Sequence, residues 1–563
     1  MRKFALCLCA MFSLLILFTK TSYAAELRRP ISPEQPMWLI HLDTWNYPDP
    51  ERIIELIPDD ILPYCVFNIS LSASDNVCIS GPNVCDSWLK ACAAKNVWCT
   101  VQCASGGHSR FSDFDLTYYE RYFNEYPNFI GWNFAEQFWG FGEEDTPTFP
   151  ERLALFGEIL KICNRYGGYL IVSFTQAEYS ADMMPIAYMK RNAIVNEQLT
   201  NHPENFICCE KYTMKRGFFE IESNCLGAYL GGYAGQYGIR FDQCGWATSD
   251  EDAEPFVTAS GAIPIMEHVM LTGETVIDGP ELIWQQDTKE TNRISTTDGY
   301  SRRNWDFFSQ FVNINIDEFR KILDGTVRIL SREEVIDRTK ICVINDLKNG
   351  NFDDYTSPAS MFHGLYRQDY DGTVNNPIAT NIWWMKKTGR YPTFPQVYGL
   401  LDETAQKLIG VKKSEYSKRW PTVDAKVAEF NKLFPQEYTG DIYAAHAENT
   451  WMTYNPYQYE HTNGTVHTSS KRAKGNIPFL YNTSESISFD YAPYSMAVMK
   501  EFSDSILLYM TNYRTTSNGG EYARQTDTVY IYDNPLYAYR NHHRRDGCYL
   551  LLQELPERRR PFR

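Results

Sequence analysis

Acidic side chains recur where strands are predicted to end, a pattern that favours acid and base chemistry at one edge of a sheet. Paired carboxyl groups can hydrolyse a glycosidic bond, because a protonated one releases the leaving oxygen while an ionised one activates water or attacks the anomeric carbon. Glu136 lies in an aromatic stretch, residues 132–139, where burial would raise the pKa of a carboxyl group. We therefore predict Glu136 as the general acid, with Asp242 and Glu281 as the carboxylates facing it.

Aromatic and polar side chains accompany these acids, and their chemistry suits a neutral sugar chain. Pyranose C–H faces pack on aromatic rings, whereas polar side chains form hydrogen bonds with hydroxyl groups. The candidate substrate-binding residues are His41, Trp45, Asn68, His108, Trp139, Tyr212, Trp246 and Trp284. Ordinary roles stay open for some of them, such as a buried core histidine at His41 or a glycine-permitted turn around His108. As a set they predict a carbohydrate ligand.

Other acids are expected near the same strand ends: Asp43, Glu178, Glu210 and Asp278. Any single one could equally cap a helix or pair with an arginine such as Arg240. We therefore rest the site on the whole set of acids.

The elements that would position these residues alternate strand and helix over residues 37–326. Apolar, β-branched or aromatic runs predict eight strands, at 37–46, 63–72, 97–107, 129–138, 168–176, 205–213, 237–246 and 274–284. An open doubly wound sheet would favour a glycine-rich phosphate-binding turn, and neither G-x-G-x-x-G nor a P-loop string occurs. We predict an α/β fold, a (β/α)8 TIM barrel, whose fourth strand opposes its eighth and whose working residues lie at the carboxyl ends of the strands.

Three segments are expected along the chain. Residues 1–24 are predicted to be a signal peptide, residues 25–327 the catalytic barrel, and residues 328–563 a C-terminal β-rich domain. In this last segment short aromatic strands separated by Asn, Gly, Pro and Thr indicate antiparallel pairing. A helical insertion is predicted between residues 396 and 433, and no function is assigned to the basic tail at 540–563.

Composition and the N-terminus limit location and partners. The 563 residues carry a formal net charge of −16, which argues against a nucleic-acid partner. A basic start, an apolar run shorter than the roughly 20 residues that span a bilayer, and small residues at 22 and 24 favour a cleaved signal over a membrane anchor. We therefore expect a secreted, periplasmic or cell-surface protein without a membrane span.

Cysteine and histidine spacings give no metal signal. No C-x-x-C or H-x-x-x-H string occurs, so we expect no metal and no cofactor. Cys65, Cys99, Cys103, Cys208 and Cys209 fall inside predicted strands, where cysteine behaves as a small buried apolar residue. This placement favours free thiols over a disulfide framework.

Several longer strings are more specific than any of these spacings. They are Pro36-Met37-Trp38, Asp43-Thr44-Trp45-Asn46-Tyr47, Glu136-Gln137-Phe138-Trp139-Gly140, Glu210-Lys211-Tyr212-Thr213 and Val276-Ile277-Asp278-Gly279-Pro280-Glu281. In these strings, and from residue 28 to about 535, the chain resembles glycoside hydrolase family 98, which includes endo-β-1,4-galactosidases that release blood-group oligosaccharides. The resemblance implies a (β/α)8 barrel followed by a β domain. It also implies Glu136 as general acid, with Asp242 and Glu281 acting together as base in an inverting hydrolysis.

The expected function is therefore an exported, endo-acting glycoside hydrolase. It would cleave an internal β-1,4 bond in a branched, blood-group-type β-galactoside, with an oligosaccharide or polysaccharide as its partner. Two alternatives stay open, an endo-β-1,4-xylanase acting on decorated xylan and a non-catalytic carbohydrate-binding protein. A retaining glycosidase would place its carboxyl groups about 5–5.5 Å apart, in contrast to about 6.5–9.5 Å for an inverting one.

Overall fold

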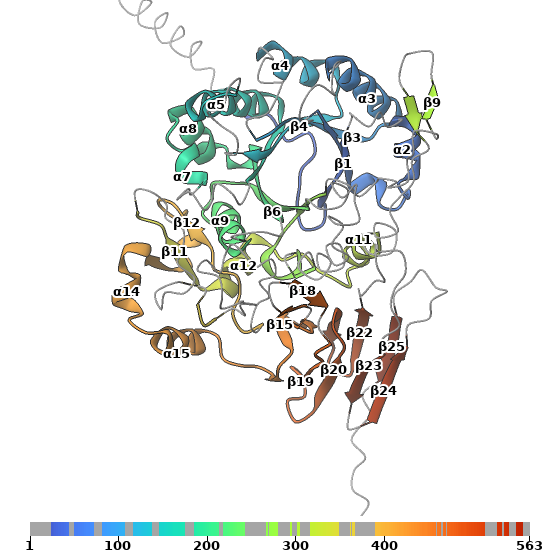
Figure 1. Cartoon of the computed structure of the whole chain (residues 1–563), viewed down its shortest axis with the longest axis vertical. Helices are drawn as coiled ribbons and strands as arrows, with labels where there is room; N and C mark the ends of the chain where they lie inside the picture. The colour runs from blue at the N-terminus through green and yellow to red at the C-terminus, as the bar shows by residue number, and fades with distance from the viewer. Residues whose placement is uncertain are drawn as a thin grey trace, which may run out of the picture.

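The computed structural model shows a helix-covered barrel with a β-rich region beside it (Figure 1). The structure describes residues 24–43, 50–71, 81–106, 116–137, 146–174, 185–212, 218–241, 266–267, 269–279, 293–295, 301–303, 316–347, 361, 363–365, 389–457, 459–462, 465–468, 470–512, 526–531, 534–539 and 548–554. The predicted signal peptide and the basic tail therefore lie almost wholly outside the described residues.

Eight parallel strands close into a barrel in chain order. They are β1 (Met37–Asp43), β2 (Cys65–Ser70), β3 (Trp98–Ser105), β4 (Phe129–Gln137), β5 (Tyr169–Phe174), β6 (Phe206–Tyr212), β7 (Gln236–Phe241) and β8 (Val276–Gly279). Each strand lies within one residue of a run that the sequence predicts as a strand. The (β/α)8 prediction is confirmed.

Helices surround the barrel on its outer face (Figure 1). They are α2 (Pro50–Leu56), α3 (Gly81–Lys95), α4 (Leu116–Glu125), α5 (Phe149–Tyr166), α7 (Pro185–Met189), α8 (Ala193–Asn201), α9 (Phe218–Leu230) and α11 (Ile316–Leu323). Short 3-10 helices precede β2 and β6, at Leu62–Tyr64 and Pro203–Asn205. Local signals set the ends of α5, which begins with a capping box between Thr148 and Glu151 and stops at Gly167 in the left-handed conformation.

Two predicted helices differ from the structure. The sequence pattern of residues 185–199 predicts a single helix, but the side chain of Asn192 accepts the N–H groups of Ile194 and Val195 and starts α8 as a separate helix. The sequence pattern also predicts a helix over residues 302–323, but residues 301–303 form a strand, and the described part of that helix is α11. The preceding strands β9 (Arg293–Ser295) and β10 (Ser301–Arg303) pair with each other.

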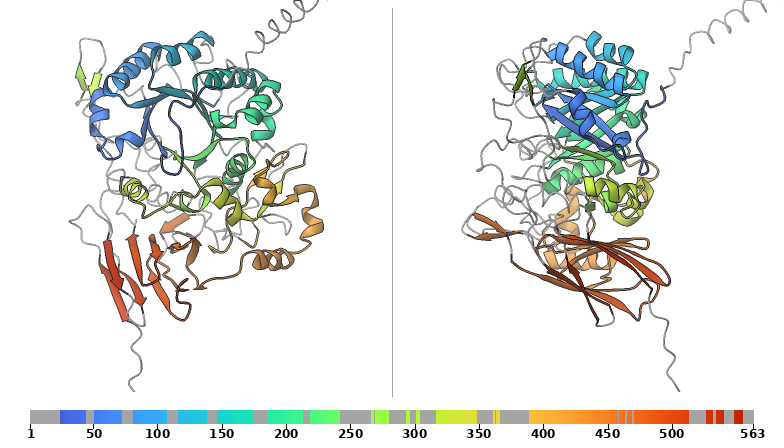
Figure 2. Two further views of the ribbon diagram at one scale, coloured as in Figure 1. Left: turned by 180° about the vertical axis from the view of Figure 1, so that it is seen from behind. Right: turned by 90° about the vertical axis from the view of Figure 1, so that its right-hand side faces the viewer.

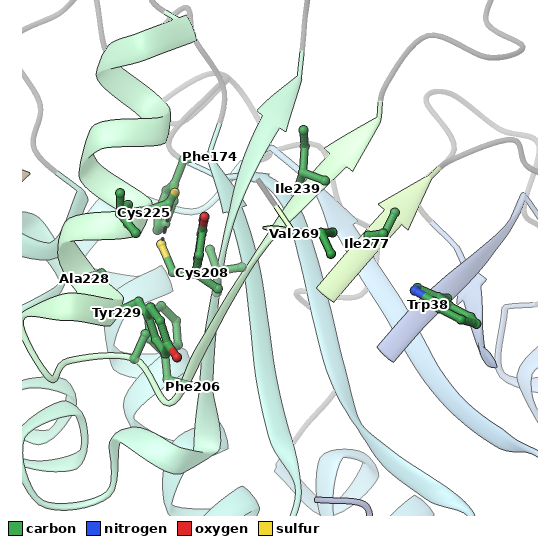
Figure 3. Packing of buried hydrophobic residues seen from close by; sticks show 14 of the residues in the cluster. Trp38, Phe174, Phe206, Cys208, Cys225, Ala228, Tyr229, Ile239, Val269 and Ile277 are labelled. Atoms are coloured by element: carbon green, nitrogen blue, oxygen red, sulfur yellow. Dashed lines mark hydrogen bonds between the residues drawn. The ribbon is translucent and has the colours of Figure 1, made fainter. Parts of the chain in front are cut away.

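Alternation along the strands divides the barrel wall into two faces. Toward the amino ends of the strands, the inward side chains form an apolar cluster that includes Leu39, Ile171, Ile207 and Val276. The outward side chains pack under the helices, where the ring of Trp38 stacks on Phe319 with ring centroids 3.9 Å apart. Figure 3 shows this outer packing around β6, β7 and α9. This apolar layer fills the barrel interior near the amino ends of the strands. The polar residues nearer the carboxyl ends therefore rest on a packed apolar layer.

A three-stranded parallel sheet follows the barrel, with β11 (Ile341–Ile344) between β12 (Gln396–Val397) and β13 (Ile409–Lys412). The accompanying helices are α12 (Arg332–Thr339), α14 (Tyr416–Arg419) and α15 (Val423–Leu433), with 3-10 helices at Ala405–Lys407 and Lys413–Glu415. The sequence predicts helices between 396 and 433, which is confirmed, but antiparallel pairing from residue 328 onward, which is wrong for this sheet.

The remaining strands form an antiparallel sandwich and a separate hairpin. One five-stranded sheet contains β14 (Thr439–Gly440), β19 (Ala473–Pro478), β20 (Ser486–Tyr491), β23 (Thr526–Ile531) and β24 (Asn534–Tyr539). The other contains β15 (Tyr443–Ala447), β16 (Thr450–Tyr454), β21 (Ser495–Glu501), β22 (Ser505–Asn512) and β25 (Cys548–Glu554). The hairpin pairs β17 (Tyr459–Thr462) with β18 (Thr465–Thr468). Here the antiparallel prediction is confirmed.

A buried carboxylate ties the sandwich to the barrel. Glu267, from the segment before β8, accepts hydrogen bonds from the hydroxyl groups of Tyr443 at 2.7 Å and Tyr454 at 3.2 Å. The two phenol rings stack with centroids 4.2 Å apart. Figure 2 shows the sandwich against one side of the barrel, and these bonds cross that boundary. The two parts therefore share a buried polar contact.

The cysteines whose side chains the structure describes are buried, and none of them forms a disulfide with another described residue, as expected for Cys65, Cys99, Cys103, Cys208 and Cys209. Burial raises the pKa of the Cys103 thiol to about 12. None of the helices in the described ranges has the length and apolar character needed to cross a bilayer.

Candidate active site

A hydrogen-bond network fills the barrel interior above the apolar layer. Asn68 Nδ2 lies 3.2 Å from His41 Nδ1 and donates to Gln102 Oε1 at 3.2 Å. Thr100 Oγ1 donates to Asn68 Oδ1 at 3.0 Å, and Gln102 Nε2 donates to Ser70 Oγ at 3.2 Å. The structure thus brings together two predicted site residues, His41 and Asn68, on neighbouring strands β1 and β2. Both are buried, so each is held in a fixed orientation.

The network continues across the barrel through an ion pair. Arg240 Nη1, on β7, donates to Gln102 Oε1 at 2.6 Å and to Asp278 Oδ2, on β8, at 3.3 Å. Asn133 Nδ2, on β4, donates to the same Asp278 oxygen at 3.1 Å. The side chains of Arg240 and Asp278 are only 4% and 0% exposed, so this is a buried salt bridge. Strands on opposite sides of the barrel are therefore joined directly.

Glu136 lies next to the end of β4 in an unusual backbone conformation. Its φ is 51°, a left-handed value that non-glycine residues seldom adopt. The pairing of β4 with β5 shifts register between Phe134 and Gln137, so Glu136 lies inside a bulge. Bulges of this kind redirect a side chain beside active sites, and strained residues concentrate there. The geometry is thus consistent with a functional role for Glu136.

Neighbouring bonds hold this bulge in place. The Glu136 N–H donates to Ser173 Oγ, on β5, at 3.3 Å. Gln137 Oε1 accepts from Nη1 of the buried Arg152 at 2.8 Å, and Gln137 Nε2 donates to the carbonyl oxygen of Gly106 at 3.3 Å. The guanidinium of Arg152 also lies 5.1 Å from the centre of the Phe134 ring. Helix α5 and strands β3 and β5 therefore fix the backbone that presents Glu136.

The predicted partner carboxylates follow the ends of the opposite strands. Glu281 comes two residues after β8, and Asp242 comes directly after β7. Both lie outside the described residues. Asn133 and Asp278 are in contact across the barrel. Glu136 follows Asn133 by three residues in the chain, and Glu281 follows Asp278 by three residues.

Most predicted sugar-binding residues also fall outside the described residues: Trp45, His108, Trp139, Trp246 and Trp284. Tyr212 is the last residue of β6, and its side chain is not among those described. Sequence reasoning missed Gln102, Asn133 and Arg152 as parts of the site. Gln102 and Asn133 stand out as polar residues within otherwise apolar strand runs, and that signal could have found them.

Glu210 does not belong to the barrel interior. By alternation it lies on the same face of β6 as Phe206 and Cys208, which pack outward. Its charge acts on Cys225 of α9 and on Tyr237 of β7, in a region that also contains the buried Glu222 and Glu274. This part of the expected acid cluster is therefore a separate, outward-facing group.

The buried Glu274 of this group should make the free energy of unfolding depend on pH. It is fully buried, and neither carboxyl oxygen has a hydrogen-bond partner among the described residues. Burial, with a smaller contribution from the charge of Glu222, raises its pKa well above the usual value. In the unfolded chain a glutamate titrates near about 4.3. Above that pH the unfolded state releases a proton that the folded state retains, so stability falls as the pH rises toward the folded pKa.

We expect Glu274→Gln to gain stability relative to the parent chain as the pH rises from about 5 to 8, at up to about 1.4 kcal/mol per pH unit. Urea unfolding at several pH values measures this difference. Glu197→Gln, at an exposed position on α8, serves as the control and is expected to show no such slope. A difference that is constant with pH would contradict a raised pKa at Glu274.

Comparison with known proteins adds sequence and fold relatives. The family model described as Glycosyl hydrolase family 98 matches residues 25–328, and the model of the C-terminal domain of that family matches residues 332–549. A curated relative, the blood-group-substance endo-1,4-beta-galactosidase of Clostridium perfringens, is 24% identical over 535 residues. The match covers 88% of this chain and 61% of the relative, so the chain spans about three fifths of that protein's length.

Solved structures show the same fold. The catalytic module of a family 98 glycoside hydrolase from Streptococcus pneumoniae, in complex with the H-disaccharide blood group antigen, superposes with a TM-score of 0.67 at 18% identity. This match covers 90% of the present chain and 92% of the other. A complex of that module with the LewisY pentasaccharide blood group antigen gives the same TM-score at 17% identity, with the same coverage.

Proposed function

The chain belongs to glycosyl hydrolase family 98, and from this premise we propose that it is an exported endo-glycosidase that cleaves a β-1,4 bond within a blood-group-type β-galactoside, with inversion. The curated relative, named for endo-1,4-beta-galactosidase activity on blood-group substance, supports the substrate class. The structural relatives, solved with blood group antigens, support it as well.

The observation that carries the proposal is the contact across the barrel between Asn133 and Asp278. It shows that β4 and β8 face each other closely, and the predicted acid and base follow these two strands. In our proposal Glu136 protonates the oxygen of the departing sugar, while Asp242 and Glu281 remove a proton from the water that attacks the anomeric carbon. Carboxyl groups from opposite strands suit a single displacement, because a water molecule must fit between the sugar and the base.

The polar network in the barrel interior provides a rigid support for this chemistry. His41, Asn68 and Gln102 are held by one another, and Gln102 is held by Arg240. Polar groups fixed before the substrate arrives need not reorganise during the reaction, which is the main source of electrostatic catalysis. The proposed role of the network is therefore to position the residues at the mouth and the sugar that enters it.

Export is part of the proposal. The backbone is attached to the barrel from the first residue after the predicted cleavage site, since Ala25 N–H donates to the Asn164 carbonyl at 3.0 Å. Arg28 follows with hydrogen bonds to the carbonyl oxygens of Phe123, Tyr126 and Tyr166. A chain beginning at residue 25 would therefore retain these contacts.

Product analysis tests the function directly. The purified chain from residue 25 is incubated with blood-group-type glycans on a β-galactoside core and with decorated xylans, while NMR follows the newly released anomer. We expect an oligosaccharide from the galactoside panel alone, appearing first as the α-anomer because a β-linkage is inverted. Release of an oligosaccharide from xylan would show that the substrate is a xylan and not a galactoside. A β-anomer as the first product would exclude inversion. No released product, with glycan binding retained, would favour a binding protein.

A further inference from the structure

A pocket of about 240 Å3 lies outside the barrel, where the unit containing the parallel sheet meets the sandwich. Its lining comes from the end of α12, from residues 389–392, from the segment after α15 and from β15. Figure 1 shows these elements below the barrel. None of the lining residues belongs to the barrel strands or to the network described above, so the pocket is separate from the candidate active site.

Cationic side chains predominate in this pocket. Among the described residues, Arg338, Lys340, Arg390 and His446 line it, against one acid, Glu437. Such an excess is notable in a chain whose formal net charge is −16. Because the rest of the protein tends to repel anions, the pocket is a local region where an anion is favoured.

The acid in the pocket is already paired with a histidine. His446 Nε2 lies 3.0 Å from Glu437 Oε2, and His446 Nδ1 lies 3.0 Å from the carbonyl oxygen of Glu448. Burial opposes the charged imidazolium, but these two acceptors outweigh it and raise the pKa of His446. Even without a charge on His446, the two arginines and Lys340 outnumber Glu437, so these side chains give the pocket a net positive charge.

The lowered pKa of Glu437, the carboxyl group in the pocket, indicates that the electrostatic potential there is positive. The hydrogen bond from His446 is the largest cause of a lowered pKa at Glu437, and the charges of Lys340 and Arg338 lower it further. An anionic group on a ligand entering the same space would experience the same attraction.

The cations and the walls are positioned in advance. Lys340 ends α12 with a φ of 60°, and its Nζ donates to the Leu433 carbonyl at 3.0 Å. The N–H of Gly389 donates to Tyr438 Oη at 3.1 Å, and a Cβ at Gly389 would meet the Ala444 carbonyl oxygen at 1.9 Å, so the two backbones are in contact. The volume corresponds to about eight waters at roughly 30 Å3 each, a space on the scale of one sugar residue.

We propose that this pocket binds one anionic sugar residue, carrying either a carboxylate or a sulfate group. Arg338, Lys340 and Arg390 would hold the acidic group, while Phe434 and Tyr438 line the same space and provide apolar surface for the ring. That the anion is a sugar rests on the proposed function, whereas its charge rests on the pocket alone.

Small probes separate this proposal from the catalytic one, because monosaccharides contain no internal bond to cleave. Titration calorimetry on the full chain compares glucuronic acid and galactose 3-sulfate, which represent the two acidic groups, with galactose. We expect either or both acidic sugars to bind and galactose to bind at least about tenfold more weakly. Removing one cation with Arg338→Gln is expected to weaken binding about fivefold, on the scale of one solvated charge contact of about 4 Å.

A second variant predicts a change of the opposite sign. Glu437→Gln removes the acid of the described lining and is expected to strengthen binding, so a general loss of folding cannot imitate both results. Lys418→Gln, on the exposed side of α14, removes one positive charge, as Arg338→Gln does. It serves as the control and is expected to leave binding unchanged. Equal binding of galactose and the acidic sugars, or no response to either pocket variant, would overturn the proposal. Inorganic sulfate binding as tightly as galactose 3-sulfate would overturn its assignment to a sugar.

Discussion

Glu136→Gln is expected to lower kcat by about a thousandfold while changing glycan affinity by no more than about threefold. Glutamine keeps the size of the side chain and its place in the β4 bulge, but it cannot donate a proton to the departing oxygen. Because the backbone at Glu136 is fixed by Ser173 and by the Gln137–Arg152 contact, the substitution should not move the strand end. Initial rates on the natural glycan, together with calorimetric affinity, measure the two quantities.

The leaving group identifies the role that is lost. An aryl glycoside whose phenol is a good leaving group needs little protonation, so the variant should recover most of the parent rate on such a substrate. Glu197→Gln, the exposed control, should retain full activity on both substrates. Full activity of Glu136→Gln on the natural glycan would remove Glu136 as the general acid, and an equal loss on both substrates would assign it another role.

Arg240→Met is expected to lower the free energy of unfolding by about 3–5 kcal/mol. Among the described residues, the substitution leaves the fully buried carboxylate of Asp278 with Asn133 as its one donor, and an uncompensated buried charge is costly. Urea unfolding measures the loss. Arg320→Met provides the matched control, because Arg320 pairs with Asp60 at the surface and should contribute about 1 kcal/mol or less.

A double variant separates charge from packing. Adding Asp278→Asn to Arg240→Met removes the stranded charge, so a substantial part of the lost stability should return. If the double variant is as unstable as the sum of the two single variants, the ion pair does not carry the effect. If Arg240→Met costs no more than Arg320→Met, the barrel interior tolerates an unpaired carboxylate.

The barrel strands could be predicted because each is a run of apolar residues separated by a helical pattern. The sequence also located Glu136, since an acid among aromatic residues is conspicuous. It could not show the bulge or the left-handed φ at Glu136, because these depend on register against β5. The sequence offers Arg240 as a partner for one of the acids, but the choice of Asp278 arises from the pairing of β7 with β8, which local pattern does not encode.

Two errors have different origins. The outward position of Glu210 could have been predicted from the sequence, because Glu210 alternates along the strand with the apolar Phe206 and Cys208. This signal was overlooked. The parallel sheet after the barrel could not have been predicted, because β11 and β13 have four residues each and β12 has two. Runs of that length show no reliable period, and their partners lie far apart in the chain.

The buried thiols determine how the protein would fail in an oxidising medium. Only thiolates react readily, and burial raises the pKa of several of these cysteines, Cys163 and Cys342 among them. In the folded state the thiols described here are therefore inert to exchange. Once the barrel opens they become nucleophiles, and mispaired disulfides would prevent refolding. The oxidation rate of these described thiols in such a medium is then set by the unfolding rate, and oxidant concentration has little influence on it.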